Sequence, residues 1–262
     1  FKQKTAYEML RSLVGSEMCI RDRGYPYPEE KRATRDLLRR RSKLVQIRAG
    51  MYNNIHLIDS QQGKGGISLS ELKNKEGREM LVGKFDNEGI SLAVESNLSL
   101  INHLDAQIKK IEKWIKEKVE IDDKQSYQLL QSYPGIGEII ALTILYEIES
   151  IERFPTVQKF SSYCRVVRTQ RESNGKRTDN KNQKIGNPHL KWAISQATIY
   201  AIKLSPEIKR YYNGLSRRKG KKKAIAILRH RIAVAIYYTL KNKEPFKIEK
   251  FLMTSKDKEK AV

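Results

Sequence analysis

The sequence predicts a mainly α-helical protein, in which a long basic helix and a coiled coil precede a helical domain containing a helix-hairpin-helix. Three observations support this fold class. Apolar residues recur at steps of three and four over long stretches, which is the helical period. Pro and Gly clusters separate these stretches as turns would. Hydrophobic residues make up 39% of the chain, which is too many for a disordered protein.

The first 23 residues are expected not to belong to the fold. Their sequence shows no clean helical or strand period, and it resembles the translated sequencing-adapter sequence found at the ends of metagenomic gene models. We therefore exclude it from the fold prediction, as one would a tag. The alternative is a real N-terminal helix. Because no Met begins the chain, we expect further protein sequence upstream of Gly24.

A long helix is predicted from Glu29 to about Leu57, after a lead-in that Pro26 and Pro28 keep extended. One side is apolar and the other strongly basic, with Asp36 as its one acidic residue. The basic residues are Lys31, Arg32, Arg35, Arg39, Arg40, Arg41, Lys43 and Arg48. A face with so strongly positive a charge is better explained by contact with phosphate than by solvation alone. Arg39, Arg40 and Arg41 are the candidate contacts.

Residues 60–89 contain scattered glycines, which predict loops and short helices, and they lack the phosphate-binding P-loop spacing. From 90 to 125 the pattern changes to the seam of a long helix or coiled coil. The seam residues are Leu98, Ile101, Leu104, Ile108, Ile111, Ile115 and Val119. Helix pairing within one chain and pairing between two chains both fit this stripe, and we expect a homo-oligomer through the coiled coil.

Residues 129–142 have the form of a helix-hairpin-helix. A Pro134-Gly135-Ile136-Gly137 turn separates two apolar helical stretches. Gly135 and Gly137 permit a close approach of the backbone to another surface. The N–H groups that begin the second helix can bind a phosphate oxygen without reading base sequence. This predicts DNA contact by both glycines; a plain helical hairpin that touches nothing is the alternative.

A polar stretch, 168–184, and two amphipathic helices complete the chain. The stretch carries six basic and two acidic residues. Its Ser173-Asn174-Gly175 segment has favourable turn chemistry and, on composition alone, is best interpreted as a loop. Between the two helices, residues 217–223 form another basic run that could contact phosphate.

The overall charge indicates the class of partner. Lys and Arg number 52 against 30 Asp and Glu, a formal net charge of +22, which favours a polyanion. Two cysteines exclude a disulfide scaffold, and four scattered histidines show no metal-ligand spacing. No apolar run is long enough for a membrane helix. We expect a soluble intracellular protein that binds nucleic acid or an acidic surface.

An ordered series of motifs adds a family resemblance. The series is PGIG at 134–137, Arg153-Phe154, Tyr163-Cys164-Arg165, Ser173-Asn174-Gly175-Lys176, and Lys184-x-Gly186-Asn187-x-x-Leu190-Lys191-Trp192-Ala193. Over about Tyr127 to Phe251 the chain resembles the IS-one-ten family of insertion-sequence transposases. Members of that family have a RuvC-like domain with four acidic metal ligands, then a coiled coil and a helical domain with a catalytic serine. They recombine DNA under the direction of a structured RNA.

The resemblance implies that Ser173 is the catalytic serine and that nearby cations assist it. A serine Oγ can attack a phosphodiester if cations neutralise the charge that develops. Arg171, Lys176, Arg177, Lys184 and Asn187 are the implied nucleic-acid contacts. Gly186 and Asn187 are also expected to cap the following helix. The family often has a second serine where this chain has Gln183, which argues against a role for a second serine there.

The resemblance also assigns the organisation of the chain. It implies the end of a truncated RuvC-like region, with the basic helix, at 24–89, a coiled-coil helix at 90–125 and a helix-hairpin-helix transposase domain at 126–252. We expect residues 1–23 to be an artefact, from their adapter-like sequence, and residues 253–262 to be a disordered tail. No metal ligand is expected in this chain, and Mg²⁺ is expected only in the intact protein, so the chain is expected to be inactive alone. The implied partners are DNA and a structured guide RNA. The implied location is the cytoplasm of a bacterium or archaeon, in association with the nucleoid. The alternatives are a non-catalytic DNA-binding module and a nuclease accessory protein.

Overall fold

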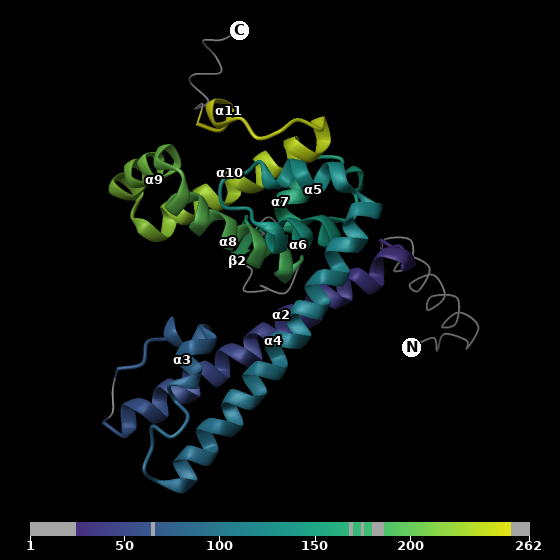
Figure 1. The fold of residues 1–262 in the computed structure, drawn as a ribbon. Helices are drawn as coiled ribbons and strands as arrows, with labels where there is room; N and C mark the ends of the chain where they lie inside the picture. Colours follow the sequence, from purple (N-terminus) through teal and green to yellow (C-terminus); the bar gives the residue numbers. More distant parts are fainter. Residues whose placement is uncertain (1–24, 64–65, 168–169, 174–175, 180–185, 253–262) are drawn as a thin grey trace, which may run out of the picture.

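The computed structural model describes residues 25–63, 66–167, 170–173, 176–179 and 186–252. Within these residues the protein is mainly helical, as predicted, and the strands described form one two-stranded sheet. Two long helices make an extended stem, and the shorter helices gather at one end of it (Figure 1). The proposed adapter segment, 1–23, lies outside the described residues.

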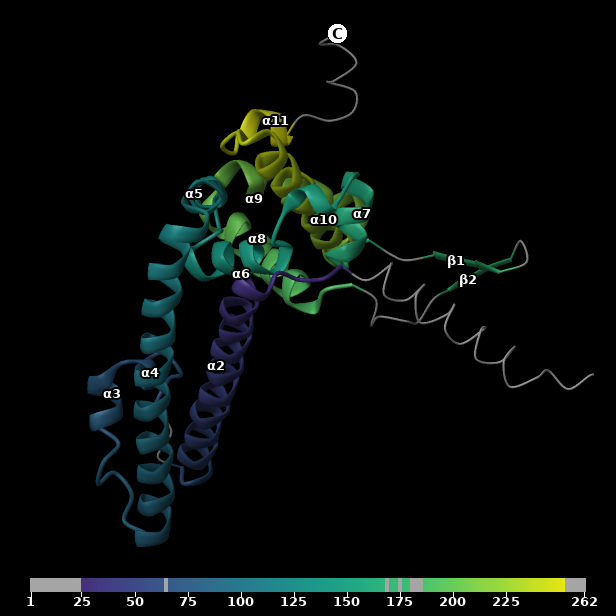
Figure 2. The ribbon, with the colours of Figure 1, turned by 90° about the vertical axis from the view of Figure 1, so that its right-hand side faces the viewer.

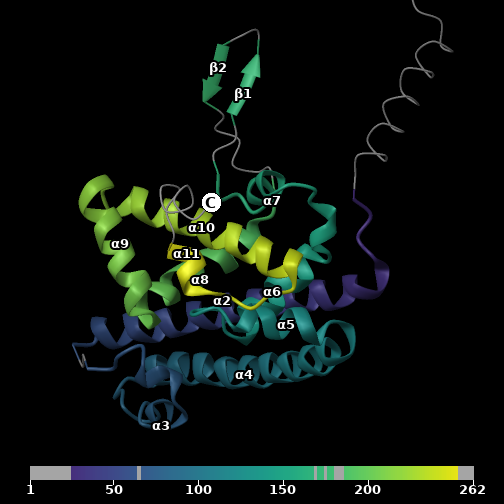
Figure 3. The same ribbon diagram turned by 90° about the horizontal axis from the view of Figure 1, so that it is seen from above.

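The stem consists of α2 (Glu29–Gln61) and α4 (Glu88–Asp122), which lie side by side along most of their length (Figures 1 and 3). Glu29 and Glu30 occupy the first turn of α2, where carboxylates interact favourably with the helix dipole. A 3₁₀ turn, η1 (Glu71–Lys73), and the short α3 (Lys75–Glu79) follow in the connection between the two helices. The predicted limits of both long helices are therefore correct to within a few residues.

The stem has a hydrophobic core of its own at the end far from the helical domain. Two residues of α2, three of α4 and three of the connection form it. Its buried members are Tyr52, Ile55, Leu72, Leu81, Phe85, Val94, Leu98 and Ile101. The glycine-punctuated segment is therefore packed against the stem, where its apolar residues are removed from water.

The predicted seam of α4 is filled by the chain itself. Asn87 caps the helix, its Oδ1 accepting a hydrogen bond from the N–H of Ile90 at 3.1 Å. Along the seam, Leu98 and Ile101 pack in the stem core, whereas Ile115 and Val119 pack in the main core. The stripe thus pairs with α2 of the same chain, and pairing between two copies stays a prediction.

The helical domain begins with α5 (Lys124–Gln131) and α6 (Glu138–Ile148), followed by η2 (Ile151–Arg153) and α7 (Val157–Tyr163). After the strands β1 (Gln170–Ser173) and β2 (Lys176–Asp179) come α8 (Pro188–Leu204), α9 (Pro206–Lys219), α10 (Lys221–Asn242) and α11 (Ile248–Leu252). Every residue of α6 from 140 to 148 is buried, so this helix is the centre of the main core. A helix that is apolar on nearly all sides is stable in water only if other elements bury it.

Two details differ from what the sequence predicts. The pattern predicts that the long helix at 90–125 separates the basic helix from a compact C-terminal domain, and that Leu204 belongs to the apolar stripe of its helix. The basic helix α2 is not held apart from the helical domain, because Leu38 belongs to the main core and α2 contacts α6. Leu204 follows the apolar period of α8 but is 63% exposed, since α8 ends there and the chain turns into α9. Helical period alone does not show where neighbouring elements stop covering a face.

Candidate nucleic-acid interface

Ser173 lies at the end of a β-hairpin that the sequence did not predict. Strand β1 pairs antiparallel with β2, and Ser173 is opposite Lys176 in the register. The two residues between the strands are Asn174-Gly175, a pair favoured in two-residue hairpin turns. The hairpin projects away from the helices (Figures 2 and 3). The backbone of these two strands therefore places Ser173, Arg171, Lys176 and Arg177 on one projecting element.

The chain segments that flank this hairpin are joined at its base. The N–H of Asn187 donates to the carbonyl of Tyr163 at 2.7 Å, and Arg165 Nε donates to the carbonyl of Gly186 at 2.9 Å. Gly186 has φ of 88°, and a Cβ there would lie 2.6 Å from the Tyr163 oxygen. Glycine is therefore required where the returning chain meets the end of α7.

Asn187 connects this base to the start of α8. Its Oδ1 accepts hydrogen bonds from the N–H groups of His189, at 2.9 Å, and Leu190, at 3.2 Å. The predicted helix cap is thus confirmed. Its Nδ2 donates to Glu147 Oε2 at 2.7 Å. Asn187 is 5% exposed, so in this structure its polar side chain faces the protein.

Glu147 is the buried acid to which this network converges. Its carboxylate is 2% exposed, and Arg39 binds both oxygens, through Nε and Nη2, each at 2.7 Å. A buried carboxylate is costly unless it is paired and hydrogen-bonded, and here it has three donors. The hydrogen bonds to Glu147 raise the pKa of Arg39. Arg39 was predicted to bind nucleic acid; the structure shows that it also joins α2 to α6.

Sequence reasoning missed Glu147, although a signal for it exists. In the stretch 139–148, Thr143 and Glu147 are the only residues without an aliphatic or aromatic side chain. An acidic residue inside so apolar a helix is rarely buried unless it has a partner. The partners themselves could not be read from the sequence, because Arg39 is 108 residues away and Asn187 is 40 residues away.

Acidic side chains from other elements also pair with part of the basic face of α2. Arg41 bonds Glu112 of α4, its Nη2 lying 2.7 Å from Oε1, and Arg48 pairs with Asp105. By contrast, Arg40 and Lys43 are exposed and form no ion pair with the described residues. The three neighbouring arginines predicted to act together therefore differ, and Arg40 is the one whose charge faces solvent unpaired.

The Pro-Gly-Ile-Gly turn lies between α5 and α6, as predicted. Gly135 has φ of 95°, and a Cβ there would lie 2.7 Å from the carbonyl oxygen of Ala197 in α8. The close approach that this glycine permits is therefore, in this structure, to a neighbouring helix. Gly137 is exposed and has open space around it. Glu138, in the first turn of α6, pairs with Lys116 of α4.

A second basic surface forms where α9 meets α10. Six exposed cations, residues 217–219 and 221–223, flank Gly220, whose φ of 79° turns the chain. The three at the end of α9 lie at the negative end of a helix dipole, which suits them. The three lysines that begin α10 lie at a positive end, which disfavours them until an anion binds. Lys184, the remaining predicted contact, lies outside the described residues.

Among the described residues, no three His, Cys, Asp or Glu side chains lie together as a metal ion would require. Cys164 is buried, and burial raises the pKa of its thiol well above the ordinary value. It is therefore a core residue and not a nucleophile. No helix in the described part of the chain is both long and apolar enough to cross a membrane.

Comparison with known proteins shows that part of the chain is similar to one family. The model of the Transposase IS116/IS110/IS902 family matches residues 127–213. The match includes the turn between α5 and α6, the projecting hairpin with Ser173, the Asn187 cap, and α8. No curated protein matches the chain significantly. Residues 127–213 of this chain are therefore similar to a region of the IS116/IS110/IS902 family of transposases.

Proposed function

We propose that this chain binds the phosphates of the DNA backbone and that Ser173 is the nucleophile in strand exchange of an insertion sequence. The observation that carries the proposal is the position of Ser173 at the end of a projecting hairpin, within the region that the transposase family model matches. A nucleophile must reach a phosphodiester on a broad, stiff duplex. A projecting element can reach it where a residue in the helical core could not.

The chemistry that we propose is a phosphoryl transfer. Ser173 Oγ loses its proton and bonds to phosphorus while one phosphorus–oxygen bond to a deoxyribose breaks, and the released sugar oxygen takes up a proton. A different sugar hydroxyl then loses its proton and bonds to phosphorus, the bond between phosphorus and Ser173 Oγ breaks, and Oγ takes up a proton. The strands are thereby exchanged and the serine is restored. Arg171, Lys176 and Arg177 share the hairpin with Ser173. Cations at this position would stabilise the charge that builds on the phosphoryl oxygens.

Phosphate contacts away from the hairpin would hold the duplex. Two surfaces are proposed for this role. One is the exposed basic face of α2, where Arg40 and Lys43 form no ion pair with the described residues, and the other is the basic corner between α9 and α10. Each phosphate neutralised releases counterions, so binding should weaken steeply with salt. Such contacts position the protein without reading sequence.

Three further partners belong to the proposal. A structured RNA of the element would direct the choice of DNA site, and copies of the chain would pair through the stem. Mg²⁺ would be a cofactor of the intact protein. The described residues offer no cluster of carboxylates that fits it, and the serine step above does not pass through it.

A second candidate is a DNA-binding module without chemistry, related to nuclease accessory proteins. The exposed Gly137 at the start of α6 favours it, because free N–H groups at a helix start bind phosphate. The two candidates differ in one outcome. A binding module would not form a covalent bond to DNA.

The test uses the complete element: the transposase with the noncoding RNA and the end sequences of its own locus. Denaturing gels should show a covalent protein–DNA adduct with the wild type. Ser173→Ala should remove the adduct and leave DNA binding near the wild-type level, since only Oγ is lost. Thr178→Ala is the matched control, because it deletes a hydroxyl from the other strand of the hairpin. An adduct that survives Ser173→Ala and is lost in Thr178→Ala would assign the nucleophile to Thr178 instead.

A further inference from the structure

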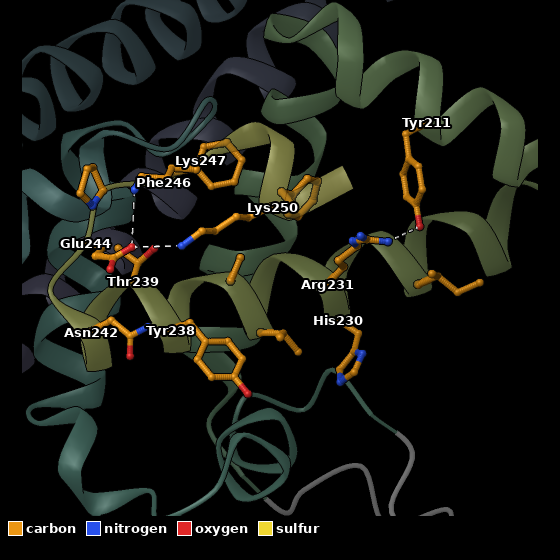
Figure 4. A pocket seen from close by; sticks show the side chains of 15 residues that line it. Tyr211, His230, Arg231, Tyr238, Thr239, Asn242, Glu244, Phe246, Lys247 and Lys250 are labelled. Atoms are coloured by element: carbon orange, nitrogen blue, oxygen red, sulfur yellow. Dashed lines mark hydrogen bonds and ion pairs between the residues drawn. The ribbon is translucent and has the colours of Figure 1, made fainter. Parts of the chain in front are cut away.

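A cavity lies between α10 and the chain segment that carries α11 (Figure 4). Its volume is about 650 Å³, which falls in the ~300–1,000 Å³ range of sites for small molecules and cofactors. All but one of its lining residues follow residue 213, so the cavity lies almost wholly outside the matched transposase region. None of the surfaces discussed above includes it.

Aromatic rings form much of the cavity wall. Phe246 and Phe251 have ring centroids 5.5 Å apart, and Phe246 also stacks on Tyr133, at 3.7 Å. These contacts fix the inner rings. Tyr238 of α10 also lines the cavity but is 49% exposed, so its ring is accessible from solvent. A flat ligand could therefore stack on an aromatic face there without displacing the core.

The charged groups around these rings are mostly basic. Four of the lining residues are cationic or can become so: His230, Arg231, Lys247 and Lys250. One carboxylate, Glu244, opposes them, and it lies 3.7 Å from Lys247 Nζ and 3.4 Å from Lys250 Nζ. Arg231 donates to Tyr211 Oη at 2.7 Å, an interaction visible in Figure 4.

Accessible aromatic faces beside cations suit one class of ligand. In proteins that bind single-stranded nucleic acid, bases stack on aromatic side chains while cations bind the phosphates. We propose that this cavity holds one unpaired nucleotide of a nucleic-acid strand, with its base against Tyr238 and its phosphate beside Lys247 and Lys250. A base within a duplex could not enter, because it is paired and stacked on both sides.

The tail of the chain itself is a poorer occupant. Residues 253–262 carry three lysines and two acidic residues, so their net charge has the same sign as that of the cavity wall. A nucleotide carries the opposite charge and also supplies the planar surface that the rings can stack on. Charge complementarity therefore favours the nucleotide.

The proposal can be tested with the purified chain and an oligonucleotide carrying 2-aminopurine, whose fluorescence falls when it stacks on an aromatic ring. Deoxyribose and ribose single strands form two arms, and a duplex of the same sequence forms a third. The wild type should quench the probe in at least one single-stranded arm. Tyr238→Ala should remove that quenching and weaken binding about five-fold or more, as loss of one base stack does. Tyr200→Ala is the matched control, since Tyr200 is similarly exposed, at 45%, but lies outside the cavity.

A second pair of variants tests the phosphate contact. Lys247→Gln with Lys250→Gln should weaken single-strand binding several-fold more than Lys109→Gln with Lys110→Gln, which removes the same charge from the exposed face of α4. Equal losses in the two pairs, or quenching that Tyr238→Ala does not change, would overturn the proposal. Quenching that appears only after residues 253–262 are removed would assign the cavity to the tail, and also overturn it. Duplex affinity, measured in parallel, tests the proposed function separately.

Discussion

Arg39 and Glu147, 108 residues apart in the sequence, form a two-pronged ion pair that joins the stem to the centre of the helical domain. Asn187 bonds the same carboxylate and also the end of α7. One network therefore joins the stem, the buried helix α6 and the chain segments on either side of the Ser173 hairpin. It consists of the side chains of Arg39, Glu147 and Asn187 and the backbone of Asn187 and Tyr163.

Replacing Arg39 should destabilise the protein. Arg39→Ala leaves the carboxylate of Glu147 buried with Asn187 as its remaining side-chain partner. Removing one member of a buried pair costs about 3–5 kcal/mol, and the partial exposure of Arg39 places the expected loss near the lower value. Urea denaturation followed by circular dichroism measures the free energy of unfolding. The adjacent Arg40→Ala, at an exposed position, should change it by less than about 0.5 kcal/mol. Similar losses in both variants would contradict a structural role for the Arg39–Glu147 pair.

The two glycines of the turn should respond differently to alanine. Gly135→Ala places a Cβ against the backbone of α8 at a positive φ, so we expect a loss of about 2 kcal/mol or more from strain and overpacking. Gly137→Ala meets open space at an ordinary φ of −81°, so we expect a loss below about 1 kcal/mol. Thermal unfolding of the two single variants compares them directly. A larger loss at Gly137 would show that the turn is not held against α8 as described.

DNA affinity should depend on the unpaired cations of α2 and less on the paired ones. Arg40→Gln with Lys43→Gln should weaken binding to all duplex sequences alike and lower the slope of log affinity against log salt by about two. Arg41→Gln should have a smaller effect, because Glu112 already neutralises that charge. Fluorescence anisotropy at several salt concentrations measures both quantities. A loss confined to one sequence would indicate that these residues read bases.

Two partly buried histidines should make stability depend on pH. Burial lowers the pKa of His230 below the ordinary histidine value of 6.5. Burial also lowers the pKa of His189; the charges of Arg39 and Arg35 act in the same direction, and Glu147 acts against them. The unfolded chain then binds more protons than the folded one as the pH falls below 6.5. This part of the stability is fully present above pH 6.5 and decreases as the pH falls toward the lower folded-state pKa values.

The matched variant isolates that effect. His189→Gln with His230→Gln should reduce the loss of unfolding free energy between pH 7 and pH 5, because neither side chain then takes up a proton. Denaturation at each pH gives the comparison, and the carboxylates common to both proteins contribute equally to each. An unchanged slope would contradict the assigned direction of the two pKa shifts.

The sequence alone determined the local structure of this protein. The start of α2 after Pro28, the apolar stripe of α4, the turn before α6 and the Asn187 cap of α8 each follow from residues within a few positions of one another. Helical period, capping and turn chemistry are short-range effects, so they can be read along the chain. The order of the motifs likewise indicated the transposase region that the family match then showed.

Tertiary structure alone decided which of those residues meet. It paired Arg39 with Glu147 and Arg41 with Glu112, it pressed Gly135 against α8, and it left Arg40 unpaired. It also set the strands of the Ser173 hairpin and the aromatic cavity beside α10. These contacts join residues many positions apart, and which side chains meet depends on how whole helices pack around the common core. No local pattern in the sequence carries that information, because the free energy that selects the packing belongs to the entire buried surface.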